Sequence, residues 1–266
     1  MNSIVFVAAG LILAGTAAAF AQAEVAPGGT LRASYLGTNP AQTTKGPDGE
    51  LRGASVDLAR ELAKRIGKPL DMKPAANPPA VIEAVRSGQA DIGFVAYEAT
   101  RLGIVEFSDT YMLVQQGFLV LGDSSMRAVA DVDREGQKIG GTRNDSMMLC
   151  LKRILKQATP VELDNNSELL IKALTSREID ALGANRQRLS SLMKSVPGSR
   201  ILDGSLFNVP QNIIVPLGRK EALAAVNAMI DEVRTSGLLR ESVAKGGAVG
   251  VEAAPKSPGS QHGCPA

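Results

Sequence analysis

The segment 140–143 (Gly-Gly-Thr-Arg) has the residue types and position best suited to binding chemistry. It follows a predicted strand, Lys138–Gly141, and leads into a predicted helix, Asp145–Gln157. Such a turn presents free backbone N–H groups at the positive end of a helix dipole, which suits an anion. Because two glycines are common at strand–helix turns, this pattern alone indicates only a candidate anion site.

Residues for acid–base, nucleophilic or metal chemistry are scarce. The only His is His262, near the C-terminus, and neither cysteine has a Cys or His at metal-ligand spacing. Glu98 is the only candidate for a general acid or base. We therefore predict a protein that is not an enzyme, with no cofactor and no metal site.

The composition is that of a soluble globular protein. Its 266 residues, 44% of them hydrophobic, suffice for one large domain or two modest lobes. The 29 cations and 27 anions are interspersed, and only 3% of residues are aromatic. A nucleic-acid-binding surface therefore has little support.

The first 23 residues read as a signal peptide. No charged residue occurs in Ile4–Ala21, and the segment 21–23 (Ala-Gln-Ala) matches the small-x-small pattern that precedes cleavage, here before Glu24. The alternative is an uncleaved membrane anchor. We predict export to the periplasm.

The cysteines and the C-terminal segment give two further expectations. Residues 247–266 are rich in Gly, Pro, Ser and Ala without periodicity, so we predict a disordered tail. Export allows a disulfide between Cys150 and Cys264. The pattern nevertheless favours a buried free Cys150 in a helix and a loose Cys264 in the tail.

Short apolar runs alternate with amphipathic segments along the chain, which predicts βαβ units and mostly parallel sheets. The predicted helices are Ser55–Ile66, Pro78–Ser87, Asp145–Gln157, Ser167–Ser176, Asn185–Ser195 and Lys220–Ser236. The predicted strands are Thr30–Ser34, Leu70–Lys73, Asp91–Val95, Gly117–Leu121, Lys138–Gly141, Asp180–Ala184, Arg200–Leu202 and Asn212–Val215.

Five segments in the same order resemble family 3 of the bacterial extracellular solute-binding proteins, the periplasmic receptors of polar-amino-acid ABC transporters. They are 49–67, 87–92 (Ser-Gly-Gln-Ala-Asp-Ile), 100–111 with its Glu-Phe-Ser run, 138–141, and 178–181 (Glu-Ile-Asp-Ala). The resemblance runs in register from about residue 29 to residue 245. No single segment is decisive, but five in this order are fairly specific.

The resemblance implies an α/β, two-lobed type 2 periplasmic binding protein fold whose lobes are joined by two crossover strands. Lobe 1 would be 29–116 plus 212–245 and lobe 2 would be 117–211, with crossovers near Gln115–Phe118 and Pro210–Ile213. A small-molecule ligand would bind in the cleft between the lobes. Closure on that ligand would shift the population of lobe arrangements.

The implied function is a monomeric receptor that delivers its solute to inner-membrane ABC permease subunits. Two alternatives remain open. One is a sensor or accessory receptor, which sequence does not separate from a transport receptor. The other is a periplasmic dehydratase on the same fold, which would need Glu98 as its acid or base.

Residues after the buried strand are the first candidate contacts. Arg101 matches the family's arginine that clamps the ligand's α-carboxylate, because a guanidinium offers two parallel donors to a carboxylate. The turn before it is short and poor in hydroxyls, so Tyr97 and Glu98 are the candidates for its polar groups. In the first-lobe loops, Thr38, Asn39 and Asn77 are hydrogen-bonding candidates, with ordinary Asx turns as the alternative.

The second-lobe candidates lie at the turn described first. Arg143, Asn144, Asp145 and Ser146 occupy the position of the family's carboxylate-binding turn, although helix capping by Asn144 or Asp145 would also explain them. Arg143 would add positive charge to the cleft or face solvent.

Asn185 stands where the family has its ammonium-binding acid. An amide cannot offset an ammonium charge, and one lost charge-assisted hydrogen bond changes binding by roughly 1.5–3 kcal/mol. Either Glu98 takes over or the ligand lacks an α-ammonium. We hypothesise a carboxylate-bearing solute that need not be a standard amino acid.

Overall fold

The computed structural model describes residues 25–245, 249–256 and 263–264. Ten strands form one mixed sheet, with the order β4-β1-β5-β11-β6-β9-β7-β8 and with β10 and β12 also paired to β6. The predicted signal peptide, residues 1–23, lies outside the described residues. In the part of the chain that is described, no helix is long and apolar enough to cross a membrane.

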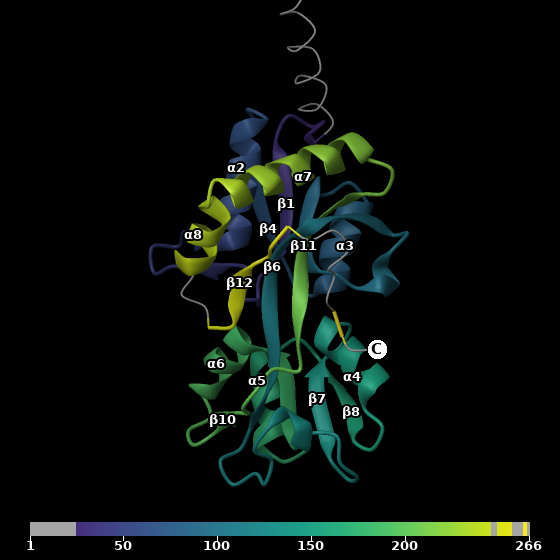
Figure 1. Ribbon diagram of the computed structural model, residues 1–266, viewed down its shortest axis with the longest axis vertical. Helices are drawn as coiled ribbons and strands as arrows, with labels where there is room; N and C mark the ends of the chain where they lie inside the picture. The colour runs from purple at the N-terminus through teal and green to yellow at the C-terminus, as the bar shows by residue number, and fades with distance from the viewer. Residues whose placement is uncertain (1–24, 246–248, 257–262, 265–266) are drawn as a thin grey trace, which may run out of the picture.

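The strands of this sheet and the helices that cover them form two lobes, which are stacked along the long axis of the molecule in Figure 1. Lobe 1 contains the parallel strands β1 (Leu31–Leu36), β4 (Leu70–Ala75) and β5 (Ile92–Ala96), with helices α2 (Ala54–Arg65), α3 (Pro78–Arg86), α7 (Lys220–Thr235) and α8 (Leu238–Lys245). Lobe 2 contains the parallel strands β7 (Lys138–Thr142), β8 (Thr159–Leu163) and β9 (Ala181–Asn185), with helices α4 (Ser146–Ile154), α5 (Ser167–Thr175) and α6 (Arg186–Met193). The smaller elements are β2 (Thr44–Lys45), β3 (Leu51–Arg52), β10 (Arg200–Ile201), η1 (Ala99–Arg101) and η2 (Val129–Asp131).

Two long antiparallel strands connect the lobes. β6 (Val105–Val120) pairs with β9 of lobe 2, and β11 (Phe207–Pro216) pairs with β5 of lobe 1. The predicted crossovers, Gln115–Phe118 and Pro210–Ile213, lie within these strands, as a two-lobed type 2 fold requires. The pairing of β6 with β11 is irregular near Asn212, whose Nδ2 donates to the carbonyl oxygen of Ser108 at 2.6 Å.

The apolar core continues from one lobe to the other along β6. Tyr111 and Phe118 of this strand are fully buried, and the Tyr111 ring meets the edge of Phe94 at 6.1 Å between centroids. The buried face of α4, with Met147 and Met148, belongs to the same cluster. The connection between the lobes is therefore packed rather than a bare linker.

Three helices that border the cleft begin at side-chain caps. Asn77, Asp145 and Asn185 are the N-caps of α3, α4 and α6, and each side chain accepts a backbone N–H bond from the first turn. These caps satisfy donors that a helix start leaves open. They also fix polar residues at the carboxyl ends of β4, β7 and β9, where ligands bind in open α/β sheets.

Some elements differ from the predictions. The predicted strand Gly117–Leu121 is only the end of the sixteen-residue β6. β8 was not predicted because Pro160 weakens its strand pattern, yet β8 is an edge strand, where proline is tolerated. α8 was not predicted either; it is short and is stabilised by packing on α7 and α2.

The prediction of a disordered tail is wrong for part of the segment. β12 (Val251–Ala253) pairs antiparallel with Met112–Val114 of β6, and the N–H of Gln115 donates to the carbonyl oxygen of Gly250 at 2.8 Å. Arg234 Nε then donates to the carbonyl oxygen of Ala254 at 3.1 Å. A free pairing edge on β6 orders residues whose composition alone favours disorder.

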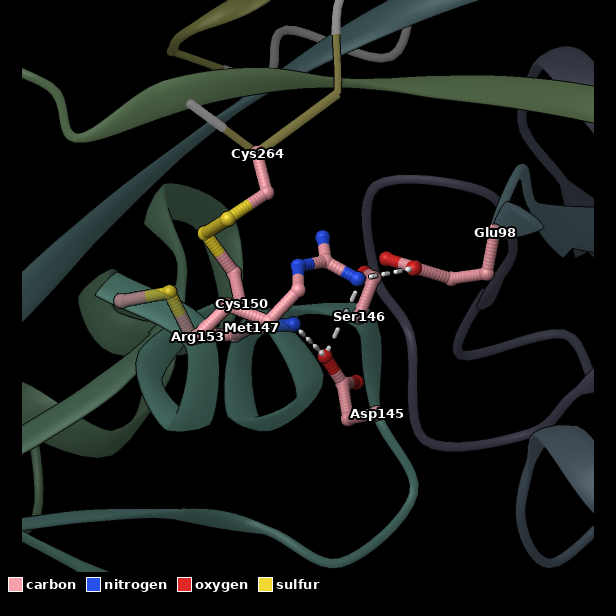
Figure 2. Close-up of a disulfide and its surroundings, with 7 residues drawn as sticks. All are labelled: Glu98, Asp145, Ser146, Met147, Cys150, Arg153 and Cys264. Atoms are coloured by element: carbon pink, nitrogen blue, oxygen red, sulfur yellow. Dashed lines mark hydrogen bonds and ion pairs between the residues drawn. A yellow bond between two sulfur atoms is a disulfide. The ribbon is translucent and has the colours of Figure 1, made fainter. Parts of the chain in front are cut away.

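The expectation of two free cysteines is also wrong. Cys150 and Cys264 form a disulfide, with 5.3 Å between their Cα atoms (Figure 2). Cys150 is fully buried on the inner face of α4, and Cys264 packs against the same apolar cluster. The bond attaches the C-terminal segment to lobe 2.

Candidate functional site

A small cavity lies between the lobes, where the connecting strands pass from one lobe to the other. Its volume is about 20 Å³. Five predicted residues line it: Asn39, Arg101, Asp145, Ser146 and Asn185. The others that line it are Leu36, Pro78, Ala96, Val114, Gln116, Val209 and Gln211. This volume holds about one water molecule, so a solute the size of an amino acid requires the lobes to rearrange.

Arg101 connects the two lobes at this cavity. It ends η1, is 6% exposed, and donates from Nη1 to the carbonyl oxygen of Ala96 at 2.7 Å. Its Nη2 donates across the cleft to the carbonyl oxygen of Asn144 at 3.0 Å. Burial lowers the pKa of Arg101, while Glu98 and Asp145 oppose that shift. Because a guanidinium stays ionised in proteins, the cavity contains a buried positive charge.

Glu98 and Tyr97 precede Arg101 but do not line the cavity. A Glu98 carboxylate oxygen, Oε2, lies 3.5 Å from Nη1 of Arg153, which points toward it from α4 (Figure 2). The Tyr97 ring packs on the edge of Phe107, with 5.2 Å between centroids. Both side chains of this turn therefore have partners outside the cavity.

The pKa of Glu98 leads to a testable prediction about how stability depends on pH. Burial raises this pKa from its usual value of 4.5, against the opposing effects of Arg101 and Arg153. The folded state therefore favours the neutral form of the Glu98 carboxyl more than the unfolded state does. The stability that this preference contributes is complete below the unfolded-state pKa and is lost as the pH rises through the folded-state pKa. Glu98→Gln keeps a neutral side chain at every pH. We expect the melting temperature of the wild type to fall relative to that of Glu98→Gln as the pH rises above 4.5.

The measurement is a pair of thermal unfolding series over pH, in the same buffers. A melting temperature of the wild type that rises relative to that of Glu98→Gln as the pH rises would contradict the prediction, because ionised Glu98 would then stabilise the fold through Arg153. Glu83→Gln is the matched control. Glu83 pairs with Arg86 on the exposed surface of α3, and this pairing lowers its pKa.

The turn before α4 supplies the lobe 2 side of the cavity. Asn144 has φ 58°, a left-handed conformation that asparagine tolerates, and this places its carbonyl oxygen against Arg101. Asp145 Oδ1 accepts the Met147 N–H at 2.8 Å, and Ser146 is buried beside it. Arg143 does not join them, because its side chain is 57% exposed and its nearest acid is Asp164 at 3.9 Å.

Hydrogen bonds between side chains also hold the lobes together. Asn185 Oδ1 accepts the Arg188 N–H at 2.9 Å as the α6 cap, while Asn185 Nδ2 donates to Asn39 Oδ1 at 3.1 Å. Asn165 Nδ2 donates to Thr38 Oγ1 at 3.0 Å and also to the carbonyl oxygen of Ala76. We call the contacts that cross between the lobes the interlobe clasp. They are Asn185–Asn39, Asn165–Thr38, Asn165–Ala76, Arg101–Asn144 and Glu98–Arg153.

Thr38 and Asn77 have structural partners. Thr38 belongs to the interlobe clasp without lining the cavity. Asn77 Oδ1 accepts the Ala80 N–H at 2.9 Å, so it caps α3 and does not line the cavity. Asn77 therefore makes the contact of an ordinary capping residue, whereas the contact of Thr38 is with lobe 2.

Sequence reasoning missed the glutamines at the connecting strands. Gln116 of β6 and Gln211 of β11 are buried and line the cavity. Gln42 Nε2 donates to Gln211 Oε1 at 2.5 Å, although 169 positions separate them. Buried amides inside predicted strands were the available signal, because such groups need partners.

No group of three or more His, Cys, Asp or Glu side chains among residues 25–245, 249–256 and 263–264 is arranged to hold a metal ion. The groups at the cavity are a guanidinium, a carboxylate, a hydroxyl and several amides. They can position a small polar solute that carries a negative charge.

Known proteins share this architecture. Residues 31–245 match the profile of the bacterial extracellular solute-binding proteins, family 3. The glutamine-binding protein of Geobacillus stearothermophilus is 26% identical over 175 residues, which cover 64% of this chain and 66% of that protein. The L-cystine-binding protein TcyJ of Escherichia coli is 26% identical over 219 residues, which cover 80% of each.

A solved structure gives the same result in three dimensions. An ancestral arginine-binding protein bound to glutamine has a TM-score of 0.70 and 26% identity, and the match covers 82% of this chain and 97% of that one. The described chain therefore has the fold of amino-acid-binding proteins. It spans just under two thirds of the glutamine-binding protein from Geobacillus stearothermophilus.

Proposed function

Because the chain belongs to family 3 of the bacterial extracellular solute-binding proteins, we propose that it is the periplasmic substrate-binding protein of an ABC transporter. Its solute would be a small carboxylate-bearing molecule, either an amino acid or a related organic acid, held between the lobes. The observation that carries this proposal is the buried guanidinium of Arg101, which faces the interlobe cavity and already bonds to lobe 2.

The interlobe clasp explains how binding and closure are coupled. Arg101, Asn39 and Asn185 line the cavity and also bond across the cleft. A solute between the lobes would exchange some of these bonds for bonds to itself. It would then bind the closed arrangement more tightly than the open one, and that difference in affinity drives closure.

The polar lining limits the solute. A carboxylate would take bidentate hydrogen bonds from Arg101. With an amide at position 185 and Glu98 paired with Arg153, the acid that lines the cavity is Asp145. An ammonium group on the solute would therefore meet Asp145. This differs from the alternative in which Glu98 takes that role, while a solute without an α-ammonium remains the other alternative.

Delivery to inner-membrane permease subunits rests on the family relationship. Catalysis is not part of the proposal, because Glu98, the candidate acid or base, lies outside the cavity and is paired. The glutamine- and cystine-binding relatives are named for binding alone.

A thermal-shift screen of the protein against amino acids, organic acids and polyamines tests the proposal. A solute at 100 times its dissociation constant should stabilise the protein by about 2.7 kcal/mol. We expect the hits to share a carboxylate. Hits restricted to polyamines or other cations would contradict the proposal.

The substitution Asn185→Asp should increase the preference of the protein for solutes that carry an amino group. Aspartate is as good an N-cap as asparagine, so α6 should form normally. A carboxylate at this position adds a charge-assisted partner for an ammonium, worth roughly 1.5–3 kcal/mol. We expect the affinity for glutamate relative to glutarate to rise by about 10-fold or more.

Calorimetric titration of the wild type and Asn185→Asp with both solutes measures this ratio. The control is Asn166→Asp, which makes the same change at the N-cap of α5, on exposed groups. An unchanged ratio in Asn185→Asp would show that position 185 does not contact the solute.

A further inference from the structure

Arg188 of α6 is a second buried arginine beside the cleft. It is 7% exposed and lies one helical turn after Asn185, which lines the cavity. Its Nη1 donates to Asn165 Oδ1 at 2.5 Å, and Asn165 in turn bonds to Thr38 of lobe 1. Arg188 is thus connected to the interlobe clasp from the lobe 2 side.

Two donors of this guanidinium are unused. Nε and Nη2 of Arg188 are buried and have no hydrogen-bond partner in the part of the chain that the structure describes. A buried charged donor without an acceptor destabilises a fold. A purely structural arginine would be expected to use these groups, whereas a binding residue keeps them for its ligand.

Arg188 does not line the cavity itself but lies one turn of α6 after Asn185, which does, and it shares an anionic neighbour with Arg101. Burial lowers its pKa, and the carboxylate of Asp145 opposes that shift. The same carboxylate also opposes the lowering of the pKa of Arg101. Asp145 is therefore the shared anionic neighbour of two buried guanidinium groups, one from each lobe.

We propose that Arg188 is a second anion-binding residue of the interlobe cleft and that the solute carries two anionic groups, one for Arg101 and one for Arg188. This inference rests on the proposed function. The substrate class is a dicarboxylic acid, with or without an amino group. In an acidic amino acid the ammonium would meet Asp145, between the two arginines.

The arrangement also gives a reason for closure. Each lobe contributes one guanidinium, so a solute with two anionic groups contacts both only when the lobes are closed. A solute with one carboxylate leaves one arginine, and its buried donors, without a partner. The receptor would therefore discriminate by the second charge.

Matched solute pairs test the proposal by titration calorimetry. The pairs are L-glutamate with L-glutamine, L-aspartate with L-asparagine, and succinate with succinamate, which differ by one carboxylate. We expect the wild type to bind at least one dianionic member about 10- to 150-fold more tightly than its amide partner. Arg188→Gln should remove most of this difference, and Arg186→Gln should keep it. Arg186 lies on the same helix and bonds to the exposed carbonyl of Gly204.

The unliganded melting temperature separates a binding role from a structural one. Arg188→Gln removes a buried charge with unused donors, so the melting temperature should stay unchanged or rise. A marked fall, together with an unchanged preference for the dianions, would overturn the proposal.

The remaining outcomes are also decisive. If the wild type binds the amide members as tightly as the acids, the role of Arg188 is refuted and the proposed function stands. If the wild type binds no member of the panel, the dicarboxylate class is refuted. If no carboxylate in the wider screen binds either, the proposed function fails as well.

Discussion

Replacement of Arg101 by alanine should weaken solute binding by about 100-fold or more. The change removes the buried guanidinium that would bind the carboxylate, and truncating one partner of a buried, hydrogen-bonded charge pair costs about 2–5 kcal/mol. It also removes the bond from Arg101 to the carbonyl oxygen of Asn144, which joins the lobes. A solute at 100 times the wild-type dissociation constant would then stabilise the variant by only about 0.4 kcal/mol, against about 2.7 kcal/mol for the wild type.

Two further variants make the Arg101 result specific. Arg101→Lys keeps the charge but not the planar pair of donors, so its affinity should lie between those of the wild type and Arg101→Ala. Arg143→Ala removes an exposed arginine from the neighbouring turn, and its solute-induced thermal shift should match that of the wild type. Full binding by Arg101→Ala would exclude Arg101 from the binding site.

Loss of the disulfide should have the largest effect on stability. The bond joins Cys150 and Cys264, which are 114 positions apart, and so closes a long loop in the unfolded chain. Cross-links of this loop length restrict the unfolded ensemble by up to about 4–5 kcal/mol, and the usual effect is about 2–4 kcal/mol. We expect Cys264→Ser to lower the free energy of unfolding by about 2–4 kcal/mol in urea titrations.

Reductant provides the matched comparison for the disulfide. Dithiothreitol should lower the unfolding midpoint of the wild type toward that of Cys264→Ser, and it should leave the variant unchanged. Two reactive thiols in the denatured, unreduced wild type would contradict the prediction, as would a wild type that is insensitive to reductant. Cys264 is the better position to replace, since Cys150 is fully buried and a serine there would place a hydroxyl in the core.

Much of the fold is encoded locally and could be predicted from sequence. The predicted helix Ser55–Ile66 differs from α2 by one residue at each end, because its apolar face and the glycine that follows it are local signals. The α/β class and the two crossover strands were confirmed, and the ordered motifs placed the chain in its family. Asp145 and Asn185 reached the cavity as helix N-caps at the ends of strands, and Arg101 reached it from the short turn that follows β5.

Sequence patterns could not predict the contacts between segments that are distant along the chain. Asn39 and Asn185 are 146 positions apart, and no local pattern pairs them. Arg188 and Arg186 lie on one short helix, yet only tertiary packing buries the first. Arg143, by contrast, has a suitable position in the chain but points to solvent beside Asp164.

The C-terminal segment shows the same limit. Its composition favours disorder, but β6 offers an unpaired edge at Met112–Val114, and β12 occupies it. The disulfide beyond it depends on where Cys264 comes to lie in the folded chain, which spacing does not reveal.

A crystal structure of the protein with the carboxylate that gives the largest thermal shift would show where the solute binds. We predict one solute between the lobes, with a carboxylate within hydrogen-bond distance of Arg101 and with contacts to the Asp145–Ser146 turn of lobe 2. A solute bound to one lobe alone, or at a site that does not include Arg101, would contradict this prediction.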